Sequence, residues 1–126
     1  MKILLTALGL AVLATSNAAW AGCTYPKAPD KIPDGTTASK AEMIAARDLF
    51  TAYNQQIVDY TKCLQTEHDD QVAKIDPKLD QAKKDAQKAE LDKVLGQKND
   101  AAVDEAQAVT GRFNAQIHAY VEKHKS

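Results

Sequence analysis

The chain has 126 residues, of which 16 are basic and 17 acidic, giving a formal net charge of −1. This length fits a single domain with a small core. The balanced charge argues against a protein that binds nucleic acid or an anionic membrane through a basic surface.

The first 21 residues have the pattern of a secretory signal peptide. Lys2 supplies a positive charge, residues 3–14 form an apolar stretch, and residues 19–21 (Ala-Trp-Ala) are a small-x-small cleavage site. The apolar stretch is shorter than the roughly 20 residues that a transmembrane helix needs. We therefore expect cleavage near Ala21, a periplasmic or secreted location, and no membrane span in the exported chain.

Cys23 lies just after this cleavage site, which leaves two interpretations. Residues 21–23 (Ala-Gly-Cys) match the end of a bacterial lipobox, in which the cysteine carries a lipid anchor. Trp20, however, occupies a position where a lipobox has leucine or a similar residue, and polar residues 15–17 interrupt the apolar stretch. Cys63 offers a partner thiol, and paired thiols persist as disulfides in exported proteins. A disulfide between Cys23 and Cys63 is favoured over lipoprotein anchoring at Cys23.

Residues 22–38 are predicted to form an extended, proline-rich segment. Its prolines restrict their neighbours to extended or turn geometry, and the Pro-Asp-Gly sequence at 33–35 is a turn signal. Ser39 and Glu42 then have the spacing of a capping box, so a helical domain over residues 39–126 is expected to begin here.

The extended segment is long enough to lie along the first helix and reach Cys63. A helix from residue 39 to residue 63 rises about 36 Å, and the residues between Cys23 and Ser39 span about 50 Å when extended. A disulfide closing a loop of about 40 residues contributes roughly 4 kcal/mol in the chain-entropy account. We therefore expect the segment to be stapled to the first helix.

The first helix carries apolar residues at the a and d positions of a heptad repeat. These residues are Met43, Ala46, Phe50, Tyr53, Ile57, Tyr60 and Leu64. Beyond Leu64, continuing the heptad repeat unchanged would place polar residues on the buried face. We therefore expect the spacing to change by one step of four residues, so that His68, Val72 and Ile75 continue this face. Asp76 and Pro77 are expected to end this helix and begin the next, with Asp76 as its N-cap.

The second half of the chain leaves two architectures open. Residues 78–100 have high helix propensity but a thin apolar face. A break at 96–99 would give a three-helix bundle, and a continuous helix would give a long antiparallel helical hairpin. No strand pattern occurs, so the predicted class is all-α in either case, with the extended N-terminal segment stapled to the first helix.

Part of the first helix is repeated near the end of the chain. The motif aromatic-Asn-x-Gln-Ile-x-x-Tyr occurs at 53–60 and again at 113–120. A duplicated helical hairpin or two helices with the same packing role would each explain the repeat. The second explanation is favoured, because unrelated helices readily acquire the same spacing of apolar core residues (the apolar seam). Two such seams could pair within one chain or between two chains, so a homodimer stays open.

The sequence carries none of the short motifs that identify an enzyme. It has no Gly-rich phosphate loop, nucleophile elbow or zinc-protease histidine pair. It also has no Cys-x-x-Cys sequence for redox chemistry or covalent haem attachment. We therefore predict that the protein is not an enzyme and has no catalytic, cofactor or metal site.

Three groups of residues have side chains that could contradict this prediction. Residues 67–70 (Glu-His-Asp-Asp) have metal-ligand side chains, but adjacent side chains diverge on a helix, so a solvated polar turn is favoured. Met43 and His118 could hold haem between two helices, but His118 falls outside the apolar seam. The third group consists of aromatic residues that could form a groove for a partner helix, but packing in the protein core is favoured for them. Its members are Tyr53, Tyr60, Phe113 and Tyr120.

Residues 23–64 contain four short motifs in a fixed order. They are C-x-Y-P at 23–26, P-x-x-I-P-D-G at 29–35, Glu42-Met43, and Y-x-x-C-L at 60–64. The pattern resembles a group of small exported helical proteins of Gram-negative bacteria that have no assigned activity. This resemblance implies export and a helical fold, and it implies no reaction.

The sequence thus predicts an exported, non-enzymatic helical protein that binds an unidentified protein or envelope partner. Two alternatives stay open, a periplasmic metal or haem carrier and a helical chaperone or adaptor.

Overall fold

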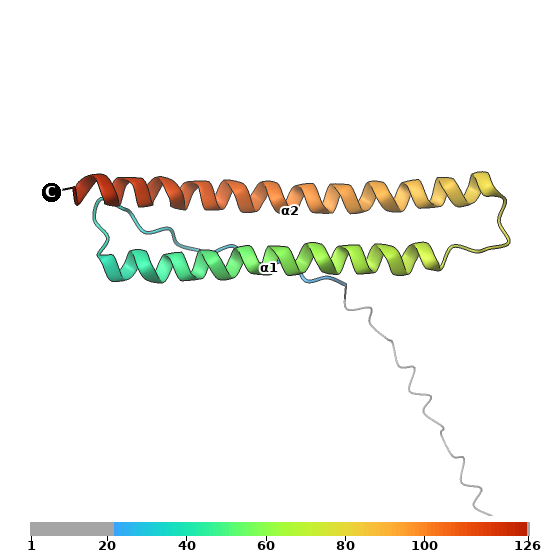
Figure 1. Ribbon diagram of the computed structural model, residues 1–126, viewed down its shortest axis with the longest axis horizontal. Helices are drawn as coiled ribbons and strands as arrows, with labels where there is room; N and C mark the ends of the chain where they lie inside the picture. Colours follow the sequence, from blue (N-terminus) through green and yellow to red (C-terminus); the bar gives the residue numbers. More distant parts are fainter. Residues whose placement is uncertain (1–21, 126) are drawn as a thin grey trace, which may run out of the picture.

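The computed structural model describes residues 22–125 as two long helices preceded by an extended segment (Figure 1). Helix α1 comprises Lys40–Ala73 and helix α2 comprises Gln81–Lys123. The two helices lie side by side and run antiparallel, so the end of α2 is beside the start of α1. The all-α class is confirmed for these residues. The predicted signal peptide, residues 1–21, lies outside the described part of the chain.

Helix α1 begins at the predicted capping box. Ser39 Oγ accepts a hydrogen bond from the Glu42 backbone N–H at 3.3 Å, and Glu42 Oε2 accepts one from the Ser39 N–H at 2.7 Å. The Ser39 N–H and, at 2.8 Å, the Ser39 hydroxyl both donate to this carboxylate, which favours its charged form and holds the pKa of Glu42 below its ordinary value. The capping-box bonds also satisfy backbone donors that the first turn of a helix leaves free.

The connection between the helices differs from the prediction at both ends. Helix α1 ends at Ala73, and the N-cap of α2 is Asp80, whose carboxylate accepts the Lys83 N–H at 2.9 Å. Asp76 instead closes a turn within the connection, accepting the Lys78 N–H at 2.8 Å. The prediction of Asp76 as N-cap was wrong because an aspartate before proline suits a turn as well as a helix start.

Helix α2 runs through residues 96–99 without a break. Gly96 costs about 1 kcal/mol relative to alanine in a helix interior, but it keeps its N–H and causes no steric clash, unlike proline. Residues 81–123 are therefore one helix, and the described chain is a hairpin rather than a three-helix bundle. Within residues 22–125 neither helix is long and apolar enough to cross a membrane.

The core lies in one half of the hairpin, which we call the proximal half (residues 22–64 and 102–125). At its centre the rings of Phe50 and Phe113 stack with centroids 4.4 Å apart. The buried hydrophobic residues are Met43, Ala46, Phe50, Tyr53, Ile57, Leu64, Ala102, Ala106, Val109 and Phe113. Those from α1 belong to the predicted heptad seam, which confirms that part of the prediction.

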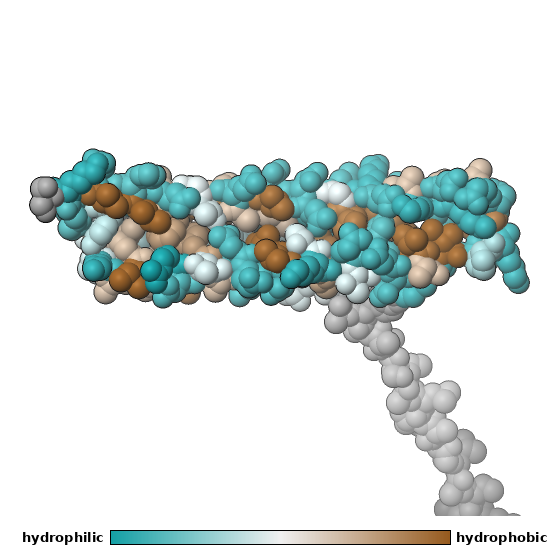
Figure 2. All heavy atoms as spheres, in the orientation of Figure 1, coloured by the Kyte–Doolittle hydropathy of each residue, from teal (hydrophilic) through white to brown (hydrophobic). Residues whose placement is uncertain are grey.

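The remaining part of the hairpin, residues 65–101, is the distal half, and none of its residues is buried. Its apolar side chains, such as Val72, Leu91 and Leu95, are only half-buried between the two helices. On the face shown in Figure 2, apolar side chains reach the surface along the boundary between α1 and α2 as far as the connecting turn. Two helices alone cannot enclose the seam that they share.

Candidate functional site

The extended segment, residues 22–38, lies along the two helices of the proximal half, and we call it the strap (Figure 1). Pro26 and Gly35 of the strap are buried. Ala28, Ile32 and Ala38 pack against the core cluster. The strap therefore closes one side of the two-helix core, because it covers apolar surface that the hairpin would expose to water.

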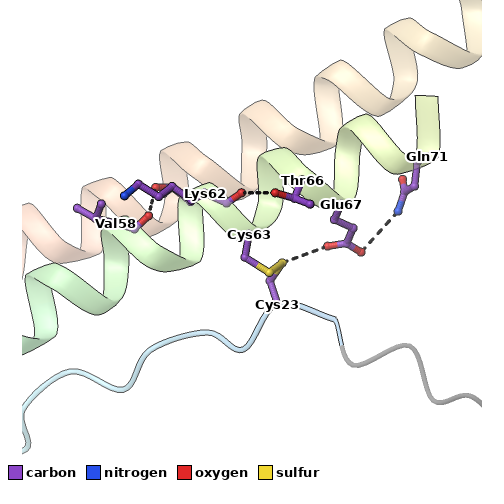
Figure 3. Close-up of a disulfide and its surroundings, with 8 residues drawn as sticks. Cys23, Val58, Lys62, Cys63, Thr66, Glu67 and Gln71 are labelled. Carbon is purple, nitrogen blue, oxygen red and sulfur yellow. Dashed lines mark hydrogen bonds between the residues drawn. A yellow bond between two sulfur atoms is a disulfide. The ribbon is translucent and has the colours of Figure 1, made fainter. Parts of the chain in front are cut away.

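The N-terminal end of the strap is joined to the C-terminal third of α1. Cys23 Sγ is bonded to Cys63 Sγ, with their Cα atoms 5.7 Å apart (Figure 3). Glu67 Oε2 lies 3.6 Å from Cys23 Sγ. Since a disulfide sulfur carries no proton to donate, this is a polar contact rather than an ordinary hydrogen bond. Gln71 Nε2 donates to the other oxygen of Glu67 at 3.5 Å.

Tyr25 connects the same end of the strap to both helices. Its ring packs edge-on against the ring of Tyr60 in α1, with centroids 5.1 Å apart. Its hydroxyl donates to Glu105 Oε2 in α2 at 2.6 Å. The bond to the Glu105 carboxylate, and secondarily partial desolvation of the half-exposed ring, raises the pKa of Tyr25 to about 12, because ionisation would break this bond.

The other end of the strap turns against the end of α2. Asp34 Oδ1 accepts hydrogen bonds from the Thr36 hydroxyl at 2.7 Å and from the Thr36 N–H at 2.8 Å, and these two bonds hold the pKa of Asp34 below its ordinary value. The Gly35 N–H donates to Gln116 Oε1 at 2.9 Å, and Lys123 Nζ donates to the Thr36 carbonyl oxygen. A Cβ atom at Gly35 would lie 1.9 Å from the Gln116 carbonyl oxygen. Only glycine permits this approach of the turn to the backbone of α2.

His68, the centre of the predicted polar turn, lies within α1 and faces α2. Its side chain is 11% exposed, so the prediction of a solvated turn was wrong. His68 Nδ1 lies 3.0 Å from Asp69 Oδ1, and Nε2 lies 2.7 Å from Asp92 Oδ1 in α2. Lys88 Nζ donates to the other oxygen of Asp92 at 2.7 Å. The predicted step in the seam brings the imidazole to the inner side of α1, where it links the helices.

The remaining candidates take structural positions. Met43 is buried and His118 is exposed, so the two side chains do not face a common space. Tyr53 and Phe113 are buried, and Tyr60 and Tyr120 pack against the same cluster, which confirms core packing for the aromatic group. Within residues 22–125, no group of three or more His, Cys, Asp or Glu side chains is arranged to hold a metal ion.

The link between His68 and Asp92 predicts a pH-dependent melting temperature. Hydrogen bonds to Asp69 and Asp92 raise the pKa of His68 above its ordinary value of 6.5. A raised pKa means that the stabilisation is complete below pH 6.5 and is lost as pH rises through the folded-state pKa. The melting temperature, measured by circular dichroism, is therefore expected to be higher at about pH 5.5 than at about pH 8.

His68→Gln is expected to abolish most of this difference. The exposed His118 provides a matched control, and His118→Gln should leave the difference unchanged. An equal pH dependence in the wild type and in His68→Gln would contradict the assignment. In strong acid a separate loss is expected, because Lys88 and then His68 lower the pKa of Asp92 and its contribution disappears as that carboxylate is protonated.

Sequence reasoning missed Tyr25, Glu105 and Asp92 as contact residues, and it missed Gly35 as the partner of Gln116. Each of these contacts joins residues at least 24 positions apart, and the periodicity of one helix does not reveal which residue of another faces it.

Comparisons with protein-family models, curated proteins and solved structures find no match to this chain.

Proposed function

We propose that this protein is exported, is not an enzyme, and acts by binding another protein or component of the cell envelope. The observation that carries the proposal is the strap joined to α1 by the Cys23–Cys63 disulfide. Such bonds persist in oxidising compartments and are reduced in the cytosol. A periplasmic or secreted location after cleavage near Ala21 would preserve this bond between the strap and α1.

The disulfide also bears on the two interpretations of Cys23. A lipid anchor is attached through the cysteine sulfur, so one sulfur atom cannot carry both the anchor and the bond to Cys63. We therefore favour a free exported protein over a lipoprotein.

Two features support binding rather than catalysis. The side chains that could take part in catalysis, such as Tyr25 and His68, instead form hydrogen bonds that connect structural elements. The helices also extend well past the core, and the distal half presents an incompletely covered apolar seam. Surfaces of this kind are typical of proteins that associate with others. Among the alternatives, the distal half favours a helical chaperone or adaptor.

Intact-mass spectrometry of protein exported with its own leader tests this proposal. We expect a chain that begins at Gly22 and is lighter by two hydrogen atoms than the same chain after reduction. In a Cys63→Ala control, reductant should not produce this mass difference. A diacylglyceryl adduct on Cys23, an uncleaved chain, or retention of the protein in the cytoplasm would each contradict the proposal.

A further inference from the structure

The groove that holds the strap continues into the distal half, where it is open. Two adjoining hollows of about 50 and 390 Å³ follow each other along the helices and share Gln71 and Leu91 in their walls. The first begins at Leu64 and Glu67, directly beside the disulfide, where Glu67 lies 3.6 Å from Cys23 Sγ. The open groove therefore starts where the strap ends.

The open groove has an apolar lining and a balanced charge. Its main apolar side chains are Leu64, Ile75, Leu91 and Val94. Its charged side chains are Glu67, Glu90, Lys74 and Lys98. With two acidic and two basic groups, the groove favours neither a polyanion nor a polycation, and its lining suits uncharged apolar side chains.

The strap shows how an extended chain is held between these two helices. In the proximal half, the Gln116 side chain of α2 accepts a hydrogen bond from the strap backbone at Gly35. In the distal half, Gln71 of α1 and Gln87 of α2 line the open groove. The bond from Gln71 to Glu67, at 3.5 Å, is at the outer limit for a hydrogen bond. Gln71 can exchange this contact for the backbone groups of an extended peptide, and Gln87 can offer its side-chain amide to the same groups, which need partners when covered.

We propose that the open groove binds an extended, apolar and nearly uncharged segment of another polypeptide, in line with the strap. This inference rests on the proposed binding function and names the class of partner. From Leu64 to the end of α1 the helix rises about 14 Å, the length of about four extended residues. Continuity with the strap groove favours an extended segment over a helix from a second copy of the chain.

A permanently unfolded protein tests the proposal. The probe is reduced, carbamidomethylated α-lactalbumin, whose blocked cysteines carry no added charge, with native α-lactalbumin as the folded control, added to the oxidised, leader-free protein. We expect the unfolded probe alone to bind and to slow amide hydrogen exchange in the distal half. Val94→Glu, which places a charge in the groove, is expected to weaken binding about tenfold.

Val103→Glu is the matched control, because Val94 and Val103 are both in α2 and are 37% and 40% exposed. Val103 lines a different hollow, with Asn54 and Val58, so its change should leave binding intact. Circular dichroism establishes that both variants are folded. Absence of binding, or equal weakening by both variants, would overturn the inference.

Light scattering tests the alternative occupant of the groove, a second copy of this chain. A dimer that Val94→Glu dissociates, without binding of the unfolded probe, would overturn the inference in favour of a second copy. Failure of these binding tests in a protein that is exported and oxidised would leave the proposed function standing with a different partner. Failure of export or of the disulfide would instead remove the proposed function itself.

Discussion

Replacing both cysteines, by Cys23→Ala with Cys63→Ala, is expected to lower the free energy of unfolding by about 4 kcal/mol. The disulfide joins residues 40 positions apart, and closing a loop of that length removes much of the conformational entropy of the unfolded chain. Small domains have a total stability of about 5–15 kcal/mol, so this loss is a large fraction of it. Urea unfolding followed by circular dichroism at the helix band measures the change.

The double substitution isolates the bond from the chemistry of free thiols. Reductant is expected to bring the wild-type protein close to the double variant and to have no effect on the double variant. The hydrogen bond from Gly35 to Gln116 does not involve the cysteines, so we expect it to persist in either case and the end of the strap near Tyr25 to detach first. Amide exchange should therefore rise in α1 near Cys63. A loss of stability below about 1 kcal/mol would show that noncovalent contacts alone hold the strap.

Gly35→Ala is expected to cost about 2–4 kcal/mol. The added Cβ would lie 1.9 Å from the Gln116 carbonyl oxygen and 2.8 Å from the Tyr120 backbone nitrogen. Both are backbone atoms of α2 and cannot rotate away, so the turn must move off the helix. Overpacking of this kind costs about 1–3 kcal/mol, and losing the hydrogen bond from Gly35 to Gln116 adds about 1 kcal/mol. The same urea unfolding measurement applies.

Two other glycines provide controls for this substitution. Gly96 and Gly111 both lie in α2, and an added Cβ at either meets no atom within 4 Å. Alanine has the higher helix propensity, so Gly96→Ala and Gly111→Ala are each expected to stabilise the protein by up to about 1 kcal/mol. If Gly35→Ala proves as harmless as these two changes, the turn does not approach α2 as closely as the structure shows.

The disulfide and Gly35 hold opposite ends of the strap, and together they explain why the core is confined to the proximal half. Beyond Cys63 nothing in residues 22–125 serves as a third element for the two helices. The link from His68 to Asp92 partly compensates, because it connects α1 and α2 where apolar burial is weakest. The proposed peptide groove occupies this same region.

Local chemistry in the sequence was sufficient for the helical class, for the α1 capping box and for the buried face of α1. The seam from Met43 to Leu64 repeats with the helical period, and that period decides which side chains share a face. Ser39 and Glu42 cap α1 through contacts three residues apart. Such features involve only near neighbours, so they can be derived before the fold is known.

Other features were decided by the tertiary structure. Asp76 and Asp80 are both competent N-caps, and Gly96 is compatible with a break or with a continuous helix, so local preference could not choose between them. The partners of Tyr25, Gly35 and His68 depend on how α1 and α2 are rotated and shifted relative to each other. That arrangement buries apolar surface contributed jointly by the strap and both helices, so no single element determines it. The sequence by itself determined which faces are apolar, and only the packing of three elements decided that one half of the hairpin is covered and the other is left open.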